Sequence, residues 1–167
     1  RQRQMCIRDR DKKIFTIDEA EEILGKNAKK FMSSLIRKKW VLQLKRGLYA
    51  IVPLDIGVKG AESFIVHDFV VASYLVEPYY IGFWSALNYY GFTEQTPSTV
   101  FIATLKRKRE ISVGKIRFKF VYFLKRKFFG YDKEWVGNRK VNISDREKTI
   151  VDCLDHPELC GGIAEVA

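Results

Sequence analysis

The sequence predicts an α+β fold, with an N-terminal winged helix-turn-helix followed by a mixed domain of helices and antiparallel strands. Three observations support this prediction. Two short segments with helical spacing of apolar residues are joined by a glycine, and two strand-like segments with a cationic turn between them follow directly. Further along the chain, segments with helical and strand patterns are interspersed. Hydrophobic residues make up 47% of the 167 residues, which is enough to build a core. We place the winged helix in residues 11–53 and the second domain in residues 62–167.

Positive charge is concentrated in two parts of the chain. The formal net charge is +10. Residues 1–52 hold 14 basic and 6 acidic side chains and residues 101–141 hold 13 basic and 3 acidic ones, while the segments 53–100 and 142–167 are both net negative. This surplus favours a polyanionic partner or an anionic membrane surface. No apolar run approaches the roughly 20 residues that span a bilayer. We therefore expect nucleic acid and no membrane as the partner.

The first ten residues, RQRQMCIRDR, have neither a helical nor a strand period. They fit a disordered basic arm that enters a minor groove, or a cloning scar that is not native to the chain, and we favour the scar. Winged helices have a further helix before the helix-turn-helix pair. Only residues 1–13 precede the pair here, and they lack an apolar period.

The first predicted helix begins at Thr16 and ends at Gly25. Thr16 and Glu19 have the spacing of a capping box, in which each side chain accepts a backbone N–H from the other residue. Apolar residues at helical spacing form one stripe. These residues are Ile17, Ala20, Ile23 and Leu24.

The second predicted helix starts from an N-cap at Asn27 and runs to about Lys39. Its buried face follows helical spacing and comprises Ala28, Phe31, Met32, Leu35 and Ile36. Its other face carries cations and small hydroxyls, which can approach a major groove closely. We expect this face to bind double-stranded DNA through Lys29, Lys30, Ser33, Ser34 and Arg37.

A predicted hairpin follows, with strands from Trp40 to Leu44 and from Leu48 to Val52. Lys45-Arg46-Gly47 lies between the strands, and the glycine permits the positive φ of a tight turn. A cationic hairpin directly after a candidate recognition helix is the order found in a winged helix. Lys45 and Arg46 would then reach phosphates or the adjacent minor groove. Each feature alone is more typical of a solvated surface, and only their order favours DNA.

In the second half of the chain, a helix is predicted from Asp68 to Val76. Another is predicted after Pro78, with Trp84, Leu87 and Tyr90 on one face and Gly91 in position to cap its C-terminal end. A strand from Val100 to Leu105 and a charged turn come next. The following strand alternates Ile116, Phe118, Phe120 and Tyr122 with cations. The turn and this strand form a secondary basic surface, which is either solvated or binds phosphates or an acidic partner. Its residues are Lys106, Arg107, Lys108, Arg109, Lys115, Arg117 and Lys119, with Lys125, Arg126 and Lys127 extending the charge.

A further hairpin over Asp132 to Lys140 is predicted to turn at Gly137-Asn138. A final helix is predicted with Ser144 as its N-cap and Glu147 at the reciprocal position. Its predicted apolar face is Ile150, Val151 and Leu154. The last residues look like the start of another helix, so we expect the C-terminus to be truncated. The three cysteines, Cys6, Cys153 and Cys160, form no Cys-x-x-Cys pair, and we expect reduced thiols in a cytoplasmic protein.

Three blocks of the sequence resemble one family. They are FTIDEAEEILG with the later LKRGLYAIVP, then YIGFWSALNYYGFTEQTP, then ISDREKTIVDCLDHPELCGGIAEV. This set resembles the AbiEi-type antitoxins, which are the antitoxin and transcriptional-regulator components of type IV toxin–antitoxin (abortive infection) systems. The poor first helix and the early C-terminal end depart from the family pattern.

The resemblance implies a DNA-binding antitoxin that represses its own operon and is paired with a nucleotidyltransferase-like toxin. It implies DNA contacts from the second helix and the hairpin turn, and a homodimer on the operator is one arrangement that fits. The residues that match the C-terminal motif are Arg146, Glu147, Thr149 and Asp152. We interpret these residues as structural.

Two alternatives remain open. One is an RNA-binding or protein-docking module that uses the basic strand at residues 115–119. The other is a nucleic-acid-processing enzyme, which needs clustered carboxylates on metal ions. Asp145 and Asp152 are the acids that share a helical face near the C-terminus, and His67 and His156 are isolated. We therefore expect no catalytic residues, no metal and no cofactor.

Overall fold

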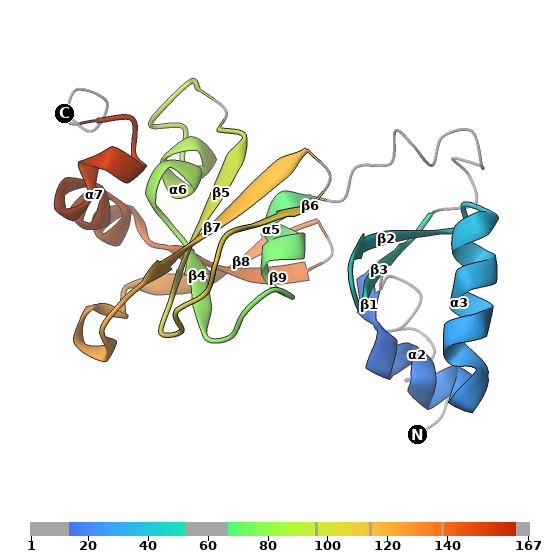
Figure 1. Cartoon of the computed structure of the whole chain (residues 1–167). Helices are drawn as coiled ribbons and strands as arrows, with labels where there is room; N and C mark the ends of the chain where they lie inside the picture. Colours follow the sequence, from blue (N-terminus) through green and yellow to red (C-terminus); the bar gives the residue numbers. More distant parts are fainter. Residues whose placement is uncertain (1–13, 53–66, 96, 114, 138, 163–167) are drawn as a thin grey trace. The chain divides into compact units, whose positions relative to one another are not determined.

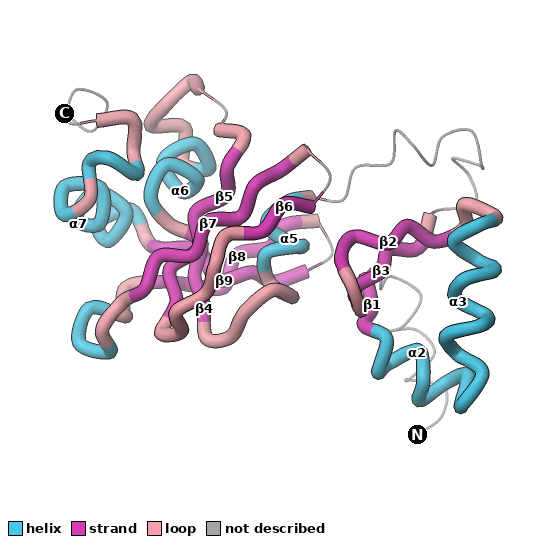
Figure 2. The backbone as a smooth tube through the Cα atoms, in the orientation of Figure 1, coloured by secondary structure: helices cyan, strands magenta, loops and turns pink. Residues whose placement is uncertain are grey.

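The computed structural model describes residues 14–52, 67–95, 97–113, 115–137 and 139–162. The chain divides into two compact units, Arg1–Val66 and His67–Ala167 (Figure 1). Both units contain helices and strands, which confirms the α+β class (Figure 2). The expectations about an N-terminal arm, a first helix and the C-terminal end lie outside the described residues. None of the helices in the described ranges is long and apolar enough to cross a membrane.

The first unit has two helices packed on a three-stranded antiparallel sheet with the order β1-β3-β2. Its elements are β1 (Ile14–Thr16), α2 (Ile17–Leu24), a 3-10 turn η1 (Gly25–Asn27), α3 (Ala28–Arg37), β2 (Val41–Lys45) and β3 (Leu48–Ile51). The sequence did not predict β1, because three residues show no period. Its strand conformation comes from pairing with β3, where Ile14 lies opposite Ala50.

Helix α2 begins with the predicted capping box. The Thr16 N–H donates to Glu19 Oε2 at 2.8 Å, and the Glu19 N–H donates to Thr16 Oγ1 at 3.3 Å. The predicted apolar stripe is right only in its first turn: Ala20 is buried, whereas Ile23 is 78% exposed and Leu24 is also exposed. The core of this unit gathers around Ala20, Met32, Val41 and Tyr49, and the last turn of α2 lies beyond it.

Helix α3 differs from its prediction at three points. Asn27 precedes the helix but makes no capping bond with its side chain, because its backbone, at φ −90° and ψ 1°, continues the η1 turn and lacks the extended conformation that aims an N-cap side chain at the first turn. The helix ends at Arg37, two residues early, and Lys39 takes a positive φ of 58° that turns the chain. Phe31 is exposed, although Ala28 and Met32 on the same predicted face are buried.

The predicted hairpin is confirmed. Strands β2 and β3 pair in an antiparallel manner, with a bulge between Gln43 and Lys45, and Gly47 has a φ of 80° in the turn. The Gly47 carbonyl accepts the Ile17 N–H at 2.9 Å. This bond holds the hairpin turn against the start of α2.

The second unit is built on a six-stranded sheet with the order β6-β7-β5-β4-β9-β8. Its strands are β4 (Tyr79–Ile81), β5 (Thr99–Thr104), β6 (Ile111–Val113), β7 (Ile116–Tyr122), β8 (Tyr131–Val136) and β9 (Arg139–Ser144). The sheet is mixed and not antiparallel as predicted, because β5 pairs parallel with β7, and β4 pairs parallel with β9. Strand β7 is longer than β6 and carries the buried Phe118, so it takes the interior position and leaves β6 at the edge.

Three α-helices and two 3-10 turns complete this unit. They are α5 (Asp68–Ala72), α6 (Phe83–Tyr89), η2 (Lys125–Lys127), α7 (Arg146–Asp155) and η3 (Pro157–Leu159). The first is four residues shorter than predicted, whereas α6 ends before Gly91 as expected, with a φ of 73° at that glycine. A core of aromatic residues from β4, α6 and β5 packs against α7, with Tyr80, Phe83 and Phe101 among its members.

Helix α7 buries the opposite side from the predicted one. Its N-cap is Asp145, which accepts the Lys148 N–H at 2.7 Å, and not Ser144, which is the last residue of β9. The predicted apolar face, Ile150, Val151 and Leu154, is 41–60% exposed. The buried residues are Lys148, Thr149, Asp152 and Cys153. Thr149 shares a 2.7 Å hydrogen bond with the buried Ser144 hydroxyl, so specific polar contacts set the orientation of the helix.

The expectation of reduced thiols is wrong for two of the three cysteines. The structure joins Cys153 and Cys160 in a disulfide, with their Cα atoms 5.7 Å apart. The turn through η3 returns the chain to α7, which brings the two residues within the usual range for this bond. Cys6 lies outside the described residues.

Candidate nucleic-acid interface

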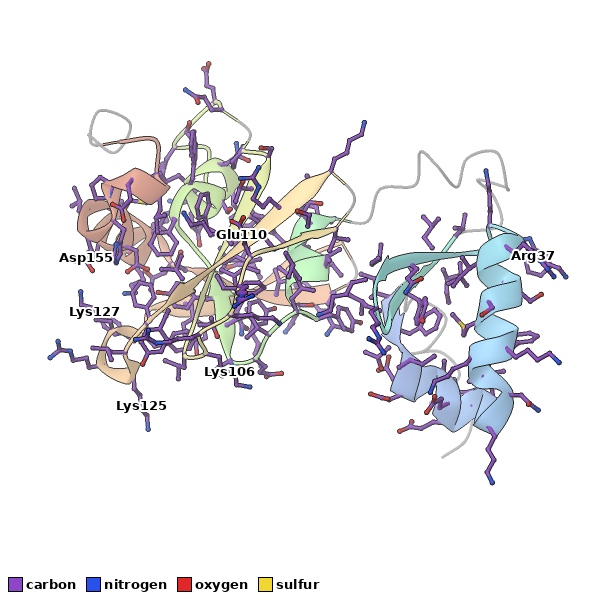
Figure 3. All side chains as sticks on the ribbon, in the orientation of Figure 1. Arg37, Lys106, Glu110, Lys125, Lys127 and Asp155 are labelled. Atoms are coloured by element: carbon purple, nitrogen blue, oxygen red, sulfur yellow. A yellow bond between two sulfur atoms is a disulfide. The ribbon has the colours of Figure 1, made fainter. Side chains whose placement is uncertain are left out.

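The predicted recognition face lies on α3. Lys29, Lys30, Ser33 and Arg37 are exposed and Ser34 is half-buried, while Ala28 and Met32 on the other side pack into the core. Figure 3 shows Arg37 at the C-terminal end of α3, pointing away from the strands. The segment is therefore a helix with one buried side and one cationic, solvent-facing side.

The contacts on this face show which groups are available to a ligand. Lys29 Nζ lies 3.5 Å from Glu21 Oε1, an exposed pair that contributes little to stability. The Ser33 hydroxyl donates to the Lys29 carbonyl at 2.9 Å, so its proton is already used within the helix. Lys30 and Arg37 make no ion pair with any residue that the structure describes. These two cations are the most available on α3.

The hairpin turn lies apart from the C-terminal end of α3. Arg46 is exposed and Lys45 is half-buried, and the turn is bonded to the start of α2 through Ile17. Strand β2 separates the turn from Arg37, and its five residues span about 17 Å. The two predicted groups of cations are therefore presented as separate contact points on one small unit.

The predicted secondary basic surface is divided by the structure. The parallel register pairs Thr99 with Arg117 and Thr104 with Tyr122. Lys115 and Arg117 therefore lie near the start of β7, whereas the turn of residues 106–109 follows the end of β5. The seven residues of β7 span about 23 Å, so these cations do not form one patch.

The end of β7 adds cations to the 106–109 turn. Because β5 and β7 are parallel, the segments that follow them leave the same edge of the sheet, and Lys125, Arg126 and Lys127 join Lys106 and Arg107 there. Figure 3 shows Lys106, Lys125 and Lys127 on this part of the second unit. The pattern of charge along the sequence could not reveal this grouping, since it depends on the parallel register.

Not every cation of the predicted surface is free to contact a ligand. Lys115, Arg117 and Lys119 are exposed and Phe118 is buried, as the predicted alternation requires. The prediction is wrong at Tyr122, which the alternation places on the apolar face and which is 44% exposed at the end of the strand. Lys108 instead donates to the Leu75 carbonyl, and its Nζ lies 4.9 Å from the centre of the Phe120 ring. Lys108 therefore acts mainly within the fold.

A buried polar network connects α7, β4 and η2. Asp152 accepts a hydrogen bond from Tyr80 Oη at 2.8 Å and another from Lys148 Nζ at 2.7 Å, and Lys148 Nζ also donates to the Lys127 carbonyl at 2.9 Å. Burial raises the pKa of Asp152, and the hydrogen bonds from Lys148 and Tyr80 oppose that rise. Burial, together with the Asp152 charge, also raises the pKa of Tyr80. The network thus cross-links three elements, and its one sequence signal is the i, i+4 spacing of Lys148 and Asp152.

The isolated histidines have local roles. His67 Nδ1 accepts the Phe69 N–H at 3.2 Å at the start of α5, and His156 Nδ1 lies 3.2 Å from Glu158 Oε1. Within the described ranges, no three His, Cys, Asp or Glu side chains come together in a group that could hold a metal ion.

Comparison of the sequence with models of known protein families finds no match, and comparison with curated proteins finds none either.

Proposed function

We propose that this chain is a DNA-binding transcriptional regulator whose first unit is a winged helix that inserts α3 into the major groove of an operator. One observation carries the proposal: α3 buries Ala28 and Met32 and turns Lys30 and Arg37 to solvent. A helix with that division can be supported from behind by its own core while its cations contact phosphates or guanine edges.

The topology of the first unit supports the same function. Two helices joined by a short turn precede a hairpin, and β1 completes the sheet beside β3. The hairpin turn carries Arg46, which is exposed and can contact a second stretch of backbone while α3 occupies a groove. Phosphate contacts from separate elements fix the orientation of a protein on DNA.

The resemblance of the three sequence blocks extends the proposal to a biological role. In this role the chain is the antitoxin of a type IV toxin–antitoxin system, represses its own operon in the cytoplasm, and is paired with a nucleotidyltransferase-like toxin. It acts by binding and not by catalysis, and two copies on one operator would match a palindromic site.

Charge reversal on α3 tests the proposal. Short duplexes that tile the region upstream of the gene are titrated with the full chain, and binding is measured by fluorescence anisotropy. We expect Lys30→Glu/Arg37→Glu to weaken sequence-specific binding strongly. If both cations contact phosphates, the slope of log affinity against log salt should fall by roughly 2, because each neutralised phosphate contributes about 0.9.

The matched control is Lys133→Glu/Lys140→Glu, which makes the same change of charge on β8 and β9, where both side chains are exposed. The control should retain operator binding apart from a small general loss from the lower net charge. Equal binding by the two double variants would show that α3 does not contact the operator and would overturn the proposal.

A further inference from the structure

We propose that the second unit binds single-stranded nucleic acid at the edge of its sheet where β5 and β7 end. This site is independent of the duplex-binding face proposed on α3. We call it the basic-aromatic edge and define it by six residues: Lys106, Arg107, Tyr122, Lys125, Arg126 and Phe129. It also differs from the basic strand at residues 115–119, whose first residues lie at the opposite end of β7.

The parallel register assembles this edge from two distant segments. Thr104 pairs with Tyr122, so the chain leaves β5 and β7 at neighbouring points and in the same direction. Lys106 follows the first strand by two residues and Lys125 follows the second by three. Figure 3 shows both side chains on this edge, well apart from Glu110, the acidic residue of the same β5–β6 connection.

The cations of the edge are available for phosphates. Lys106, Lys125 and Arg126 are exposed, and none of them makes an ion pair with another residue in the described part of the chain. Lys127 is different because its Nζ lies 2.6 Å from Asp155 Oδ2, so we leave it out of the site. Cations that lack acidic partners favour a polyanion.

Two exposed aromatic rings lie on the same segments as these cations, Tyr122 at the end of β7 and Phe129 after η2. Tyr122 is 44% exposed, and the guanidinium carbon of Arg107 lies 4.9 Å from the centre of its ring. Phe129 is 60% exposed, and Lys148 Nζ lies 4.6 Å from the centre of its ring. Unpaired bases stack on aromatic rings and on arginine planes, whereas the bases of a duplex are already stacked on each other. The mixture of rings and cations therefore favours a single strand over a duplex.

The η2 part of the edge is anchored to α7 by hydrogen bonds. The buried Lys148 donates to the Lys127 carbonyl at 2.9 Å and to Asp152 at 2.7 Å, which anchors η2 to α7. On the surface, Lys127 Nζ also lies 2.6 Å from Asp155 Oδ2 of α7. Lys125 and Arg126 are thus presented on a braced turn, which lowers the conformational entropy lost when a ligand binds.

The test uses the full chain and a fluorescent oligouridylate of about 12 nucleotides, within the usual site size for one module. We expect Lys125→Glu/Arg126→Glu to weaken binding at least tenfold in an anisotropy titration. The control with the same charge change, Lys133→Glu/Lys140→Glu, should lose much less affinity. Lys30→Glu/Arg37→Glu on α3 should still bind the oligouridylate, which separates this proposal from the one on duplex binding.

The aromatic part is tested by Phe129→Ala and Tyr122→Leu, whose folding is checked by circular dichroism. Loss of one stacking contact should weaken oligouridylate binding by about 5- to 100-fold, while binding of a duplex of equal length should change little.

Equal binding by the Lys125→Glu/Arg126→Glu variant and the control would overturn the site. Unchanged affinity in both aromatic variants would overturn the single-strand assignment. So would binding to phosphatidylserine vesicles without binding to the oligouridylate, which would indicate a membrane surface.

Discussion

Replacing Lys148 with methionine tests whether α7 is held in place by its polar side. The Lys148 side chain is 5% exposed, and its ammonium bonds to Asp152 at 2.7 Å and to the Lys127 carbonyl at 2.9 Å. Methionine keeps most of the volume but leaves the Asp152 carboxylate buried without its cation. Removing one partner of a buried pair costs about 3–5 kcal/mol, which is a large part of the ~5–15 kcal/mol that stabilises a typical domain.

The loss should also depend on pH. Burial raises the pKa of Asp152, and the hydrogen bond from Lys148 opposes that rise. Without Lys148 the pKa of Asp152 in the folded chain should lie further above its value in the unfolded chain, so the folded chain takes up a proton more readily. A group with a raised pKa contributes stability below its unfolded pKa and loses that contribution as the pH rises through its folded pKa. The deficit of the Lys148→Met variant should therefore shrink as the pH is lowered from neutral.

Urea unfolding followed by circular dichroism measures both effects. The control is Val151→Ser on the exposed side of α7, which should change the free energy of unfolding by no more than about 0.5 kcal/mol. The double variant Lys148→Met/Asp152→Leu removes both charges and should recover part of the loss. The recovery is incomplete because the Tyr80 hydroxyl and the Lys127 carbonyl lose their hydrogen-bond partners. If Lys148→Met costs no more than Val151→Ser, the assignment of the buried face of α7 is wrong.

Three further predictions concern single contacts. Thr16→Val removes the hydroxyl that accepts the Glu19 N–H and should destabilise the first unit by about 1 kcal/mol in urea unfolding; an unchanged midpoint would contradict the capping box. Gly47→Val forces a branched side chain to a φ of 80° and should cost about 1–3 kcal/mol in the same assay; Gly47→Asn, which tolerates this φ better, should cost less. The hydrogen bond from Lys127 lowers the pKa of Asp155 below its ordinary value. The pair therefore stabilises the fold above the pKa of an unfolded aspartate, and this stabilisation is lost as the pH falls through the lowered pKa of the folded protein. The carboxyl resonance of Asp155 should titrate at a higher pH in Lys127→Ala, and the same midpoint in both proteins would contradict the pairing.

The sequence predicted elements that are specified by local signals. The capping box at Thr16 and the positive φ at Gly47 each depend on a few neighbouring residues, and both occur in the structure. Strands β1 and β4 were missed, because three residues are too few to show a period. These strands are defined by distant partners: Ile14 pairs with Ala50, and Ile81 pairs with Ile102 and Ile143.

The error on α7 has a different origin. Counting apolar residues at helical spacing predicted that Ile150, Val151 and Leu154 would be buried. The count gives no weight to hydrogen bonds with residues elsewhere in the chain, such as those of Asp152 with Tyr80 and of Thr149 with Ser144. A buried polar group without a partner costs more than an exposed apolar side chain, so these pairings decide which face turns inward.

The same limit applies to the candidate sites. The cations of α3 could be predicted because one helix carries them all. The grouping of Lys106 with Lys125 requires the parallel pairing of β5 with β7. Residue spacing contains no direct signal for that pairing, because the intervening edge strand β6 could equally have joined β5 in a simple meander.

The position of β4 has a consequence during protein synthesis. This strand lies between β5 and β9, and Ile81 meets its partner Ile143 only after β5, β6, β7 and β8 have all been translated. Until then a nascent chain exposes one unpaired side of what will become an interior strand, and such edges promote aggregation. A chain whose synthesis terminates before β9 should therefore be an insoluble fragment and not a smaller folded domain.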